Sequence, residues 1–420
     1  MCVQKYILRL GLFAIIMFML ACCSRQPAPM TADPLSTSTL TTPLVVETST
    51  KTAISPSPTG TFATAEPTPL AAWERLGELD NRYIYYISTL DTVEQDGQRQ
   101  SQIWRASLDH QEQTLVHSRV TYSGTVVWEG TGDEDWLTYH WSKLTLSPDK
   151  QTLAFAVSYQ HIHARHSYHV SIWTISVDGT NLQKRATFDS DLIVLELAWS
   201  PDGSKLGLVL EHIAFVTPRT VAVIDLDTND VMQYEEFSGF AFAPQGQDLV
   251  LGRSLGGDNL QEIGLHRITE KGVKNILLVL EPGQPFYPAW SPDGTEIVYS
   301  RSTPNLQESS PIGTFSLHLD SGRVRQLATT GATYPIKWSP DGQFIAFVDE
   351  EKWPPRVDVI DRDGNLVHTF AEEFYLDVQW SDDSKAILAN SAPTGHYMIA
   401  FVDDGTTVIV PNKGEHYLTW

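Results

Sequence analysis

Cysteine is almost absent from this chain of 420 residues, and the positions of its three cysteines narrow the possible chemistry. Cys2, Cys22 and Cys23 all lie within the first 23 residues. The rest of the chain therefore offers no disulfide, no thiolate zinc site and no cysteine nucleophile. A domain built from it must be stabilised by its apolar core without covalent cross-links.

Positive charge is also scarce. The sequence has 29 Lys and Arg against 51 Asp and Glu, which gives a net charge of −22 at pH 7. A surface this acidic disfavours nucleic acid and anionic lipid as partners and is compatible with cations, basic proteins or neutral glycans. We therefore expect no nucleic-acid partner.

The usual sequence signatures of catalysis are missing too. The chain has no G-x-S-x-G elbow, no H-E-x-x-H, no G-x-x-x-x-G-K-[ST] and no G-x-G-x-x-G. Catalysis would then have to depend on Asp, Glu or His residues brought together from separate loops, which leave no local motif.

The N-terminus has the organisation of a secretory signal peptide. Two basic residues precede one apolar run, Leu10–Ala21, which is too short for a comfortable membrane span. The run ends in Ala21-Cys22-Cys23, which looks like a bacterial lipobox, where a small residue precedes the lipidated cysteine. This predicts a signal peptide over 1–21 and lipidation of Cys22, with Cys23 as the alternative; an ordinary N-terminal membrane helix remains the other interpretation.

The segment 22–71 is rich in Pro, Ser and Thr and poor in large apolar residues. Such a composition cannot bury enough surface to offset chain entropy, so it predicts a disordered tether. The expected location is the extracytoplasmic face of the cell membrane, with the lipid anchor as the membrane contact. The folded domain is expected over 72–420.

A motif of an apolar strand, a tight turn that matches Ser-Pro-Asp-Gly in full or in part, and a second apolar strand recurs six times in this part of the chain. The residues before the turns are Leu146, Trp199, Phe242, Trp290, Trp338 and Trp380, in steps of 42 to 53 residues. Proline suits the second position of a tight turn, Asp bonds to nearby backbone N–H groups, and Gly adopts positive φ at little cost. A step of this length matches one four-stranded propeller blade.

The best copies are Trp290-Ser291-Pro292-Asp293-Gly294 and Trp338-Ser339-Pro340-Asp341-Gly342. They resemble the repeat of TolB-like, WD40-like (PD40) β-propellers, and the resemblance extends over about residues 80–420. It implies an all-β propeller in which the motif residues are structural. The predicted structural residues are Trp199, Pro201, Asp202, Gly203, Trp290, Pro292, Asp293, Gly294, Trp338, Pro340, Asp341, Gly342, Trp380 and Trp420.

The ends of the domain decide the number of blades. Strand-like segments at 82–88 and 102–108 precede the first motif and form part of another blade without its own Ser-Pro-Asp-Gly turn. Trp420 lies 40 residues after Trp380, where the next repeat would place its Trp. We therefore predict seven blades, with the C-terminal strand as the innermost strand of the N-terminal blade, which leaves no open edge in the ring. The alternative is six blades with 72–135 as an appendage.

Two local features are candidate binding sites. Four histidines, which suit a divalent metal such as Zn, Cu or Ni, lie between the second and third strands of one blade: His161, His163, His166 and His169. An aromatic and acidic loop before the first full repeat could hold a sugar or a basic peptide through Trp128, Asp133, Asp135 and Trp136. A polar hairpin tip and inter-blade packing are the competing interpretations.

Several Asp-rich turns could hold calcium, although none has EF-hand spacing and ordinary turn bonding explains them equally well. No cofactor is otherwise expected. The turns in question are 225–230, 361–364 and 403–405.

Fold alone does not decide function. The anchor, the tether and the structural repeats favour a binding scaffold that engages a protein or polymer of the cell envelope. A glycan lyase or hydrolase with its site in the central channel is the second hypothesis. An accessory or sensory subunit of an envelope complex is the third.

Overall fold

The structure is a computed structural model. The chain divides into Met1–Pro67 and Thr68–Trp420, and every described residue belongs to the second unit. The described residues are 70–81, 83–90, 98–109, 111–127, 134–161, 167–189, 191–212, 219–245, 248–253, 264–268, 275–280, 285–302, 311–330, 335–349, 355–370, 375–391, 396–411 and 415–420. The predicted signal peptide, Cys22 and Cys23, and nearly all of the predicted tether therefore lie outside the described part. Within the described ranges, no helix is long and apolar enough to cross a membrane.

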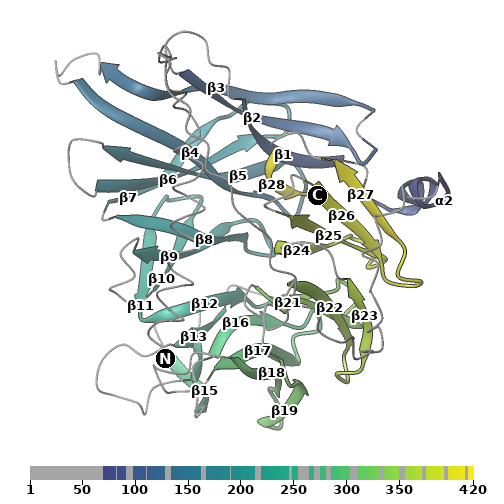
Figure 1. The fold of residues 1–420 in the computed structure, drawn as a ribbon. Coiled ribbons are helices and arrows are strands. Elements are labelled where there is room, and N and C mark those ends of the chain that lie inside the picture. The colour runs from purple at the N-terminus through teal and green to yellow at the C-terminus, as the bar shows by residue number, and fades with distance from the viewer. Residues whose placement is uncertain are drawn as a thin grey trace, which may run out of the picture. The chain divides into compact units, whose positions relative to one another are not determined.

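The domain is a β-propeller of seven four-stranded antiparallel blades in a ring, as the repeat spacing predicts (Figure 1). Blade 1 has β28 (Glu415–Thr419), β1 (Tyr83–Leu90), β2 (Gln98–Ser107) and β3 (Gln113–Val127), and blade 2 has β4 (Glu134–Leu146), β5 (Thr152–His161), β6 (Ser167–Ser176) and β7 (Gln183–Asp189). Blade 3 has β8 (Leu192–Trp199), β9 (Lys205–His212), β10 (Thr220–Asp225) and β11 (Val231–Glu235), and blade 4 has β12 (Phe237–Phe242), β13 (Leu249–Arg253), β14 (Gly264–Ile268) and β15 (Asn275–Leu280). Blade 5 has β16 (Pro285–Trp290), β17 (Glu296–Ser302), β18 (Pro311–His318) and β19 (Arg323–Ala328), and blade 6 has β20 (Lys337–Trp338), β21 (Phe344–Asp349), β22 (Arg356–Asp361) and β23 (Leu366–Phe370). Blade 7 has β24 (Tyr375–Trp380), β25 (Ala386–Ser391), β26 (His396–Phe401) and β27 (Thr407–Pro411).

The C-terminal strand closes the ring. β28 pairs with β1 in antiparallel register, with Tyr85 opposite Thr419 and Ser88 opposite Glu415, and Figure 1 shows the yellow end of the chain beside the purple-blue β1. The first strands of successive blades also touch around the centre, since β28 contacts β4, β4 contacts β8, and β12, β16, β20 and β24 contact one another in sequence. The predicted closure is confirmed, and the six-bladed alternative is wrong because β28, β1, β2 and β3 complete a full blade.

Blades 1 and 2 are joined by a long hairpin that the sequence did not indicate. β3 continues past its pairing with β2, so that Ser123–Val127 pair with Glu134–Thr138 of β4. The two blades therefore share one eight-stranded sheet. Asp135 and Trp136 lie on β4 and not in a loop, which corrects the expected placement of these two residues.

The core is divided into layers between blades. The buried apolar side chains of the described residues form seven clusters, one for each pair of neighbouring blades. β21 shows how the strands supply them: Ile345 and Phe347 pack toward blade 5, and Ala346 and Val348 pack toward blade 7. Because successive side chains of a strand point to opposite faces, each blade is apolar on both faces.

A short helical segment precedes the ring. α2 (Leu70–Glu74) and the 3₁₀ turn η1 (Arg75–Glu78) bury Ala72 and Leu76 in the layer between blades 7 and 1. Arg75 donates to Asp403 at 2.8 Å and lies over the ring of Phe401, with its Cζ 4.0 Å from the centroid. The entry to the domain is thus fixed to blade 7.

Candidate functional site

The repeat turns use their polar groups internally. In blade 3, Ser200 Oγ donates to Asp202 Oδ1 at 2.6 Å, and Asp202 Oδ1 also accepts the backbone N–H of Ser204 at 3.0 Å. The N–H of Gly203 closes the turn on Ser200 O at 2.9 Å, and Gly203 adopts a φ of 74°. The same Ser-to-Asp bond recurs at four other turns, which begin at Ser147, Ser291, Ser339 and Ser381. In these five turns the Ser and Asp side chains bond within the turn itself.

The repeated Trp rings join neighbouring blades. The indole N–H of Trp338 donates to Ala289 O of the preceding blade at 3.2 Å, and that of Trp380 donates to Lys337 O at 3.0 Å. At the closure, Trp420 donates to Trp380 O at 2.8 Å, so the C-terminal residue acts as the Trp of blade 1.

A polar cluster lies where first strands from non-neighbouring blades meet. Lys337 Nζ on β20 is 3.7 Å from Glu196 Oε1 on β8. These strands belong to blades 6 and 3, so the contact must cross the central channel of the ring. Local distortion accompanies it, because β8 carries a β-bulge between Val194 and Glu196, and bulges redirect side chains.

Three further residues extend this channel cluster. Arg219 donates to Glu211 Oε1 at 2.9 Å and also bonds to Tyr287 of blade 5. Burial raises the pKa of the Tyr287 hydroxyl, against the lowering effect of Arg219. Burial likewise opposes the charge of Arg219, but Tyr287 and Glu211 outweigh it, so the pKa of the guanidinium lies above its ordinary value. The cluster is a set of mutually compensated charges.

A glycine allows Tyr287 to reach blade 3. Tyr287 has a φ of 49°, uncommon for a residue with a side chain, and its Cα lies 3.4 Å from the place where a Cβ of Gly239 would be. Blade 4 thus lets the first strand of blade 5 approach closely.

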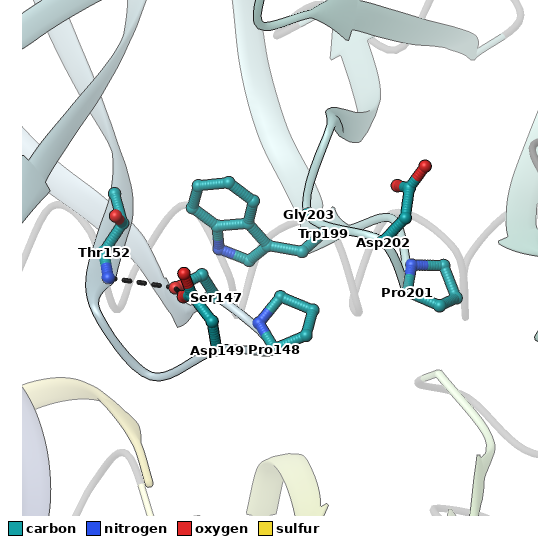
Figure 2. Close-up of a pocket in the computed structure, with 8 residues that line it drawn as sticks. All are labelled: Ser147, Pro148, Asp149, Thr152, Trp199, Pro201, Asp202 and Gly203. Atoms are coloured by element: carbon teal, nitrogen blue, oxygen red, sulfur yellow. Dashed lines mark hydrogen bonds between the residues drawn. The ribbon is translucent and has the colours of Figure 1, made fainter.

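A second candidate site is a hollow between the turns of blades 2 and 3, with a volume of about 360 Å³. Figure 2 shows the ring of Trp199 in its wall, with Asp149 on one side and Asp202 on the other. We call it the 2/3 hollow. Its lining residues are Ser147, Pro148, Asp149, Thr152, Trp199, Pro201, Asp202 and Gly203.

The structure describes only part of the predicted histidine site. His161 ends β5 and His169 lies on β6, paired with Tyr159 across the hairpin, whereas His163 and His166 lie outside the described residues. Within the described ranges, no three His, Cys, Asp or Glu side chains are grouped as metal ligands would be. Metal binding by this run stays a prediction.

The aromatic and acidic patch also stays a prediction. Trp128 and Asp133 lie outside the described residues, and only the backbone of Asp135 and Trp136 is described, where β4 pairs with β3.

The Asp-rich turns bind protein groups. Asp225 Oδ1 accepts the N–H groups of Asp227 and Thr228, each at 3.1 Å, and Asp361 accepts from Asn365. Hydrogen bonds to these N–H groups lower the pKa of Asp225, with Lys205 adding to the effect. Turn bonding therefore accounts for these aspartates.

A set of arginines that the repeat pattern did not predict ties one blade to the next. Arg325 of β19 donates to Asp363 Oδ1 at 3.0 Å and to Arg362 O at 2.8 Å, both in the next blade. Arg185 of β7 donates to Leu226 O at 3.0 Å in the same manner. The sequence does show an Arg in the fourth strand of two repeats, Arg185 and Arg325. Only the ring geometry shows that these arginines bind the next blade.

The sequence and the fold were compared with known proteins. Residues 150–409 match the family model described as PD40, TolB beta propeller domain. The periplasmic gluconolactonase PpgL of Pseudomonas aeruginosa shares 14% identity with a TM-score of 0.51 over 81% of this chain and 99% of that one. TolB of Acinetobacter baumannii shares 15% identity with a TM-score of 0.44 over 72% of this chain and 67% of that one. An oligogalacturonate lyase solved with manganese shares 13% identity with a TM-score of 0.45 over 78% of this chain and 89% of that one. No curated protein matches the chain in sequence. At these identities the structural likeness concerns the fold alone.

Proposed function

Since this chain belongs to the PD40 family of TolB β-propeller domains, we propose that it is a binding scaffold of the cell envelope, anchored by lipid on Cys22 and tethered by 22–71. The propeller then displays its two faces to a protein or polymer partner. The anchor and the location rest on the sequence pattern of the first 71 residues.

One observation carries the choice of binding over catalysis. In the described part of the channel, Glu196 is bridged to Lys337, and Glu211 and Tyr287 are both bound by Arg219. A glycan hydrolase or lyase in the channel needs a carboxylate or another base that can reach substrate. These groups neutralise one another instead, and they fasten three blades together.

The test is capture of a partner by the full-length protein in its own envelope. Tagged protein is cross-linked in cells, extracted in detergent and quantified by mass spectrometry, with a matched control that carries residues 1–71 alone. We expect one protein or polymer to be recovered in stoichiometric amount by the full chain and not by the control. Absence of such a partner, together with turnover by the purified protein on a panel of glycans, would favour the enzyme instead.

Anchoring is tested separately. Cys22→Ala should abolish incorporation of labelled palmitate and move the protein from the membrane to the soluble fraction, whereas Cys23→Ala should leave both unchanged. The reverse pattern would move the lipid to Cys23, and retention of both variants in the membrane would favour an N-terminal helix.

A further inference from the structure

Neighbouring blades meet through equivalent residues, so one interface can be compared with another. Between blades 5 and 6, Arg362 fills the space above the Trp. Its Nη1 donates to Asp293 Oδ2 at 2.8 Å and its Nη2 to Thr295 Oγ1 at 2.8 Å. Its Cζ lies 5.6 Å from the ring centroid of Trp338. The guanidinium is held between a carboxylate of one blade and an indole of the next.

The interface between blades 4 and 5 has the same combination from a different strand. Arg267 of β14 donates from Nε to Asp248 Oδ2 at 2.9 Å. Its Cζ lies 5.7 Å from the ring centroid of Trp290. Two interfaces of this ring therefore place an arginine between a carboxylate and the repeat Trp.

The 2/3 hollow has the same walls without the arginine. Asp149 lies three residues after the Trp position of blade 2, as Asp293 does in blade 5. Trp199 is the Trp of blade 3, as Trp338 is the Trp of blade 6. In blade 3, Leu226 is the residue equivalent to Arg362 of blade 6. The backbone N–H of Leu226 donates to Ser204 O at 3.0 Å, and that of Arg362 donates to the equivalent Gln343 O at 3.0 Å. A leucine is too short to reach across to the carboxylate.

The carboxylate of Asp149 is oriented as Asp293 is. Its Oδ1 accepts Ser147 Oγ at 2.5 Å and the N–H of Gln151 at 3.0 Å. Among the described residues none donates to its Oδ2, whereas the Oδ2 of Asp293 receives Arg362. The bond from Ser147, with that from Gln151, lowers the pKa of Asp149, and an exposed Asp is ionised at neutral pH.

The hollow is not a general property of the repeat. Between blades 6 and 7, Phe344 stacks on Trp380 with ring centroids 6.2 Å apart and planes at 18°. Phe344 lies six residues after the Trp position of its blade and is therefore equivalent to Thr152, which lines the hollow. The small Thr152 and the short Leu226 together leave the space open.

We propose that the 2/3 hollow binds the guanidinium of an arginine side chain supplied by a protein partner, in the place that Arg362 fills one half-ring away. The inference rests on the proposed scaffold function and names the chemistry of its partner. A planar guanidinium can stack on Trp199 while it donates to Asp149, which an ammonium cannot do equally well. The net charge of −22 also attracts a basic partner.

The test uses ¹⁹F NMR of the full-length protein labelled with 5-fluorotryptophan, with N-acetyl-arginine amide as probe and N-acetyl-lysine amide as its matched comparison. Trp199→Phe assigns the resonance. We expect the arginine probe to shift the Trp199 signal with a dissociation constant of roughly 30–200 mM, as one exposed cation–π contact and one ion pair allow. The lysine probe should bind at least about 3-fold more weakly.

Two variants locate the binding. Asp149→Asn should weaken the arginine probe by about 3-fold or more, while Asp178→Asn, the same charge change at an exposed turn outside the hollow, should have no effect. Leu226→Arg should supply the guanidinium from within the chain, abolish probe binding and raise the melting temperature. If Leu226→Arg does not fold, Asp149→Asn against Asp178→Asn decides alone.

The inference is overturned if the Trp199 signal does not respond to arginine, if lysine binds equally well, or if both Asp variants behave alike. These outcomes leave the scaffold function standing when the capture experiment recovers a partner. A partner that is captured by wild type and equally by Leu226→Arg would also overturn the arginine site, whereas loss of capture in that variant alone would support it.

Discussion

Closure of the ring by the last residue can be tested with one substitution. Trp420 is 7% exposed, packs in the layer between blades 7 and 1, and donates to Trp380 O at 2.8 Å. A buried Trp removes about 200 Å² from water, which at about 25 cal/mol per Å² corresponds to about 5 kcal/mol. Core Trp-to-Ala substitutions cost about 3–5 kcal/mol, so the two estimates agree for Trp420→Ala.

The assay is equilibrium unfolding in urea followed by far-UV circular dichroism, because removal of a Trp would alter fluorescence. Trp380→Ala is the matched control: its ring is 8% exposed and donates to Lys337 O at 3.0 Å, but it lies within the ring and not at the closure. We expect both variants to lose about 3–5 kcal/mol. A loss below about 1 kcal/mol for Trp420→Ala, with a full loss for Trp380→Ala, would refute the closing role of the C-terminal strand.

Two further predictions concern packing and charge. Gly207→Ala should lower the free energy of unfolding by about 1–3 kcal/mol, because its new Cβ would lie 2.2 Å from the buried ring of Phe240. Gly77→Ala is the control and should be tolerated, since nothing lies within 4 Å of its new Cβ. Equal urea midpoints for the two variants would contradict this. Arg362→Ala should cost about 1 kcal/mol at pH 7, a value discounted because the arginine is one-third exposed and Asp293 nearly half exposed. Burial works against ionisation of Asp293, but the hydrogen bonds from Arg362, Ser291 and Thr295 outweigh it and lower the pKa of this carboxyl, so its stabilising effect is present above about pH 4 and declines as the pH falls further. The difference between wild type and Arg362→Ala should therefore shrink below pH 4 in urea titrations, and a constant difference would refute the ion pair.

The repeats made the fold predictable. The steps between Trp positions fixed the length of a blade, and the late Trp420 indicated that the chain ends where the ring begins. Both predictions depend only on local turn chemistry and on counting. The long hairpin formed by β3 and β4 was missed because nothing in the residues between them marks how far two strands continue beyond a blade.

The contacts between blades were not predictable in the same way. Glu196 and Lys337 are far apart in sequence and neither is one of the recurring turn or Trp residues, so only a closed ring of seven blades brings them together. The bulge beside Glu196 and the positive φ of Tyr287 have no signature in one sequence. For the histidine run and the aromatic patch, whose residues lie largely outside the described part, the sequence remains the only guide.

Differences among the repeats carry more functional information than the repeats themselves. In the Ser-Pro-Asp turns that start at Ser200, Ser291 and Ser339, the Ser hydroxyl bonds to the Asp carboxylate of the same turn, so a matching turn identifies the scaffold and says nothing of a ligand. Blade 3 has Leu226 where blade 6 has Arg362. The carboxylate of Asp149 and the indole of Trp199 therefore lack the guanidinium that links the equivalent pair between blades 5 and 6. Between blades 5 and 6 the ring fills this space with its own Arg362, and between blades 2 and 3 the space is open. The filled interface therefore indicates which ligand chemistry suits the open one.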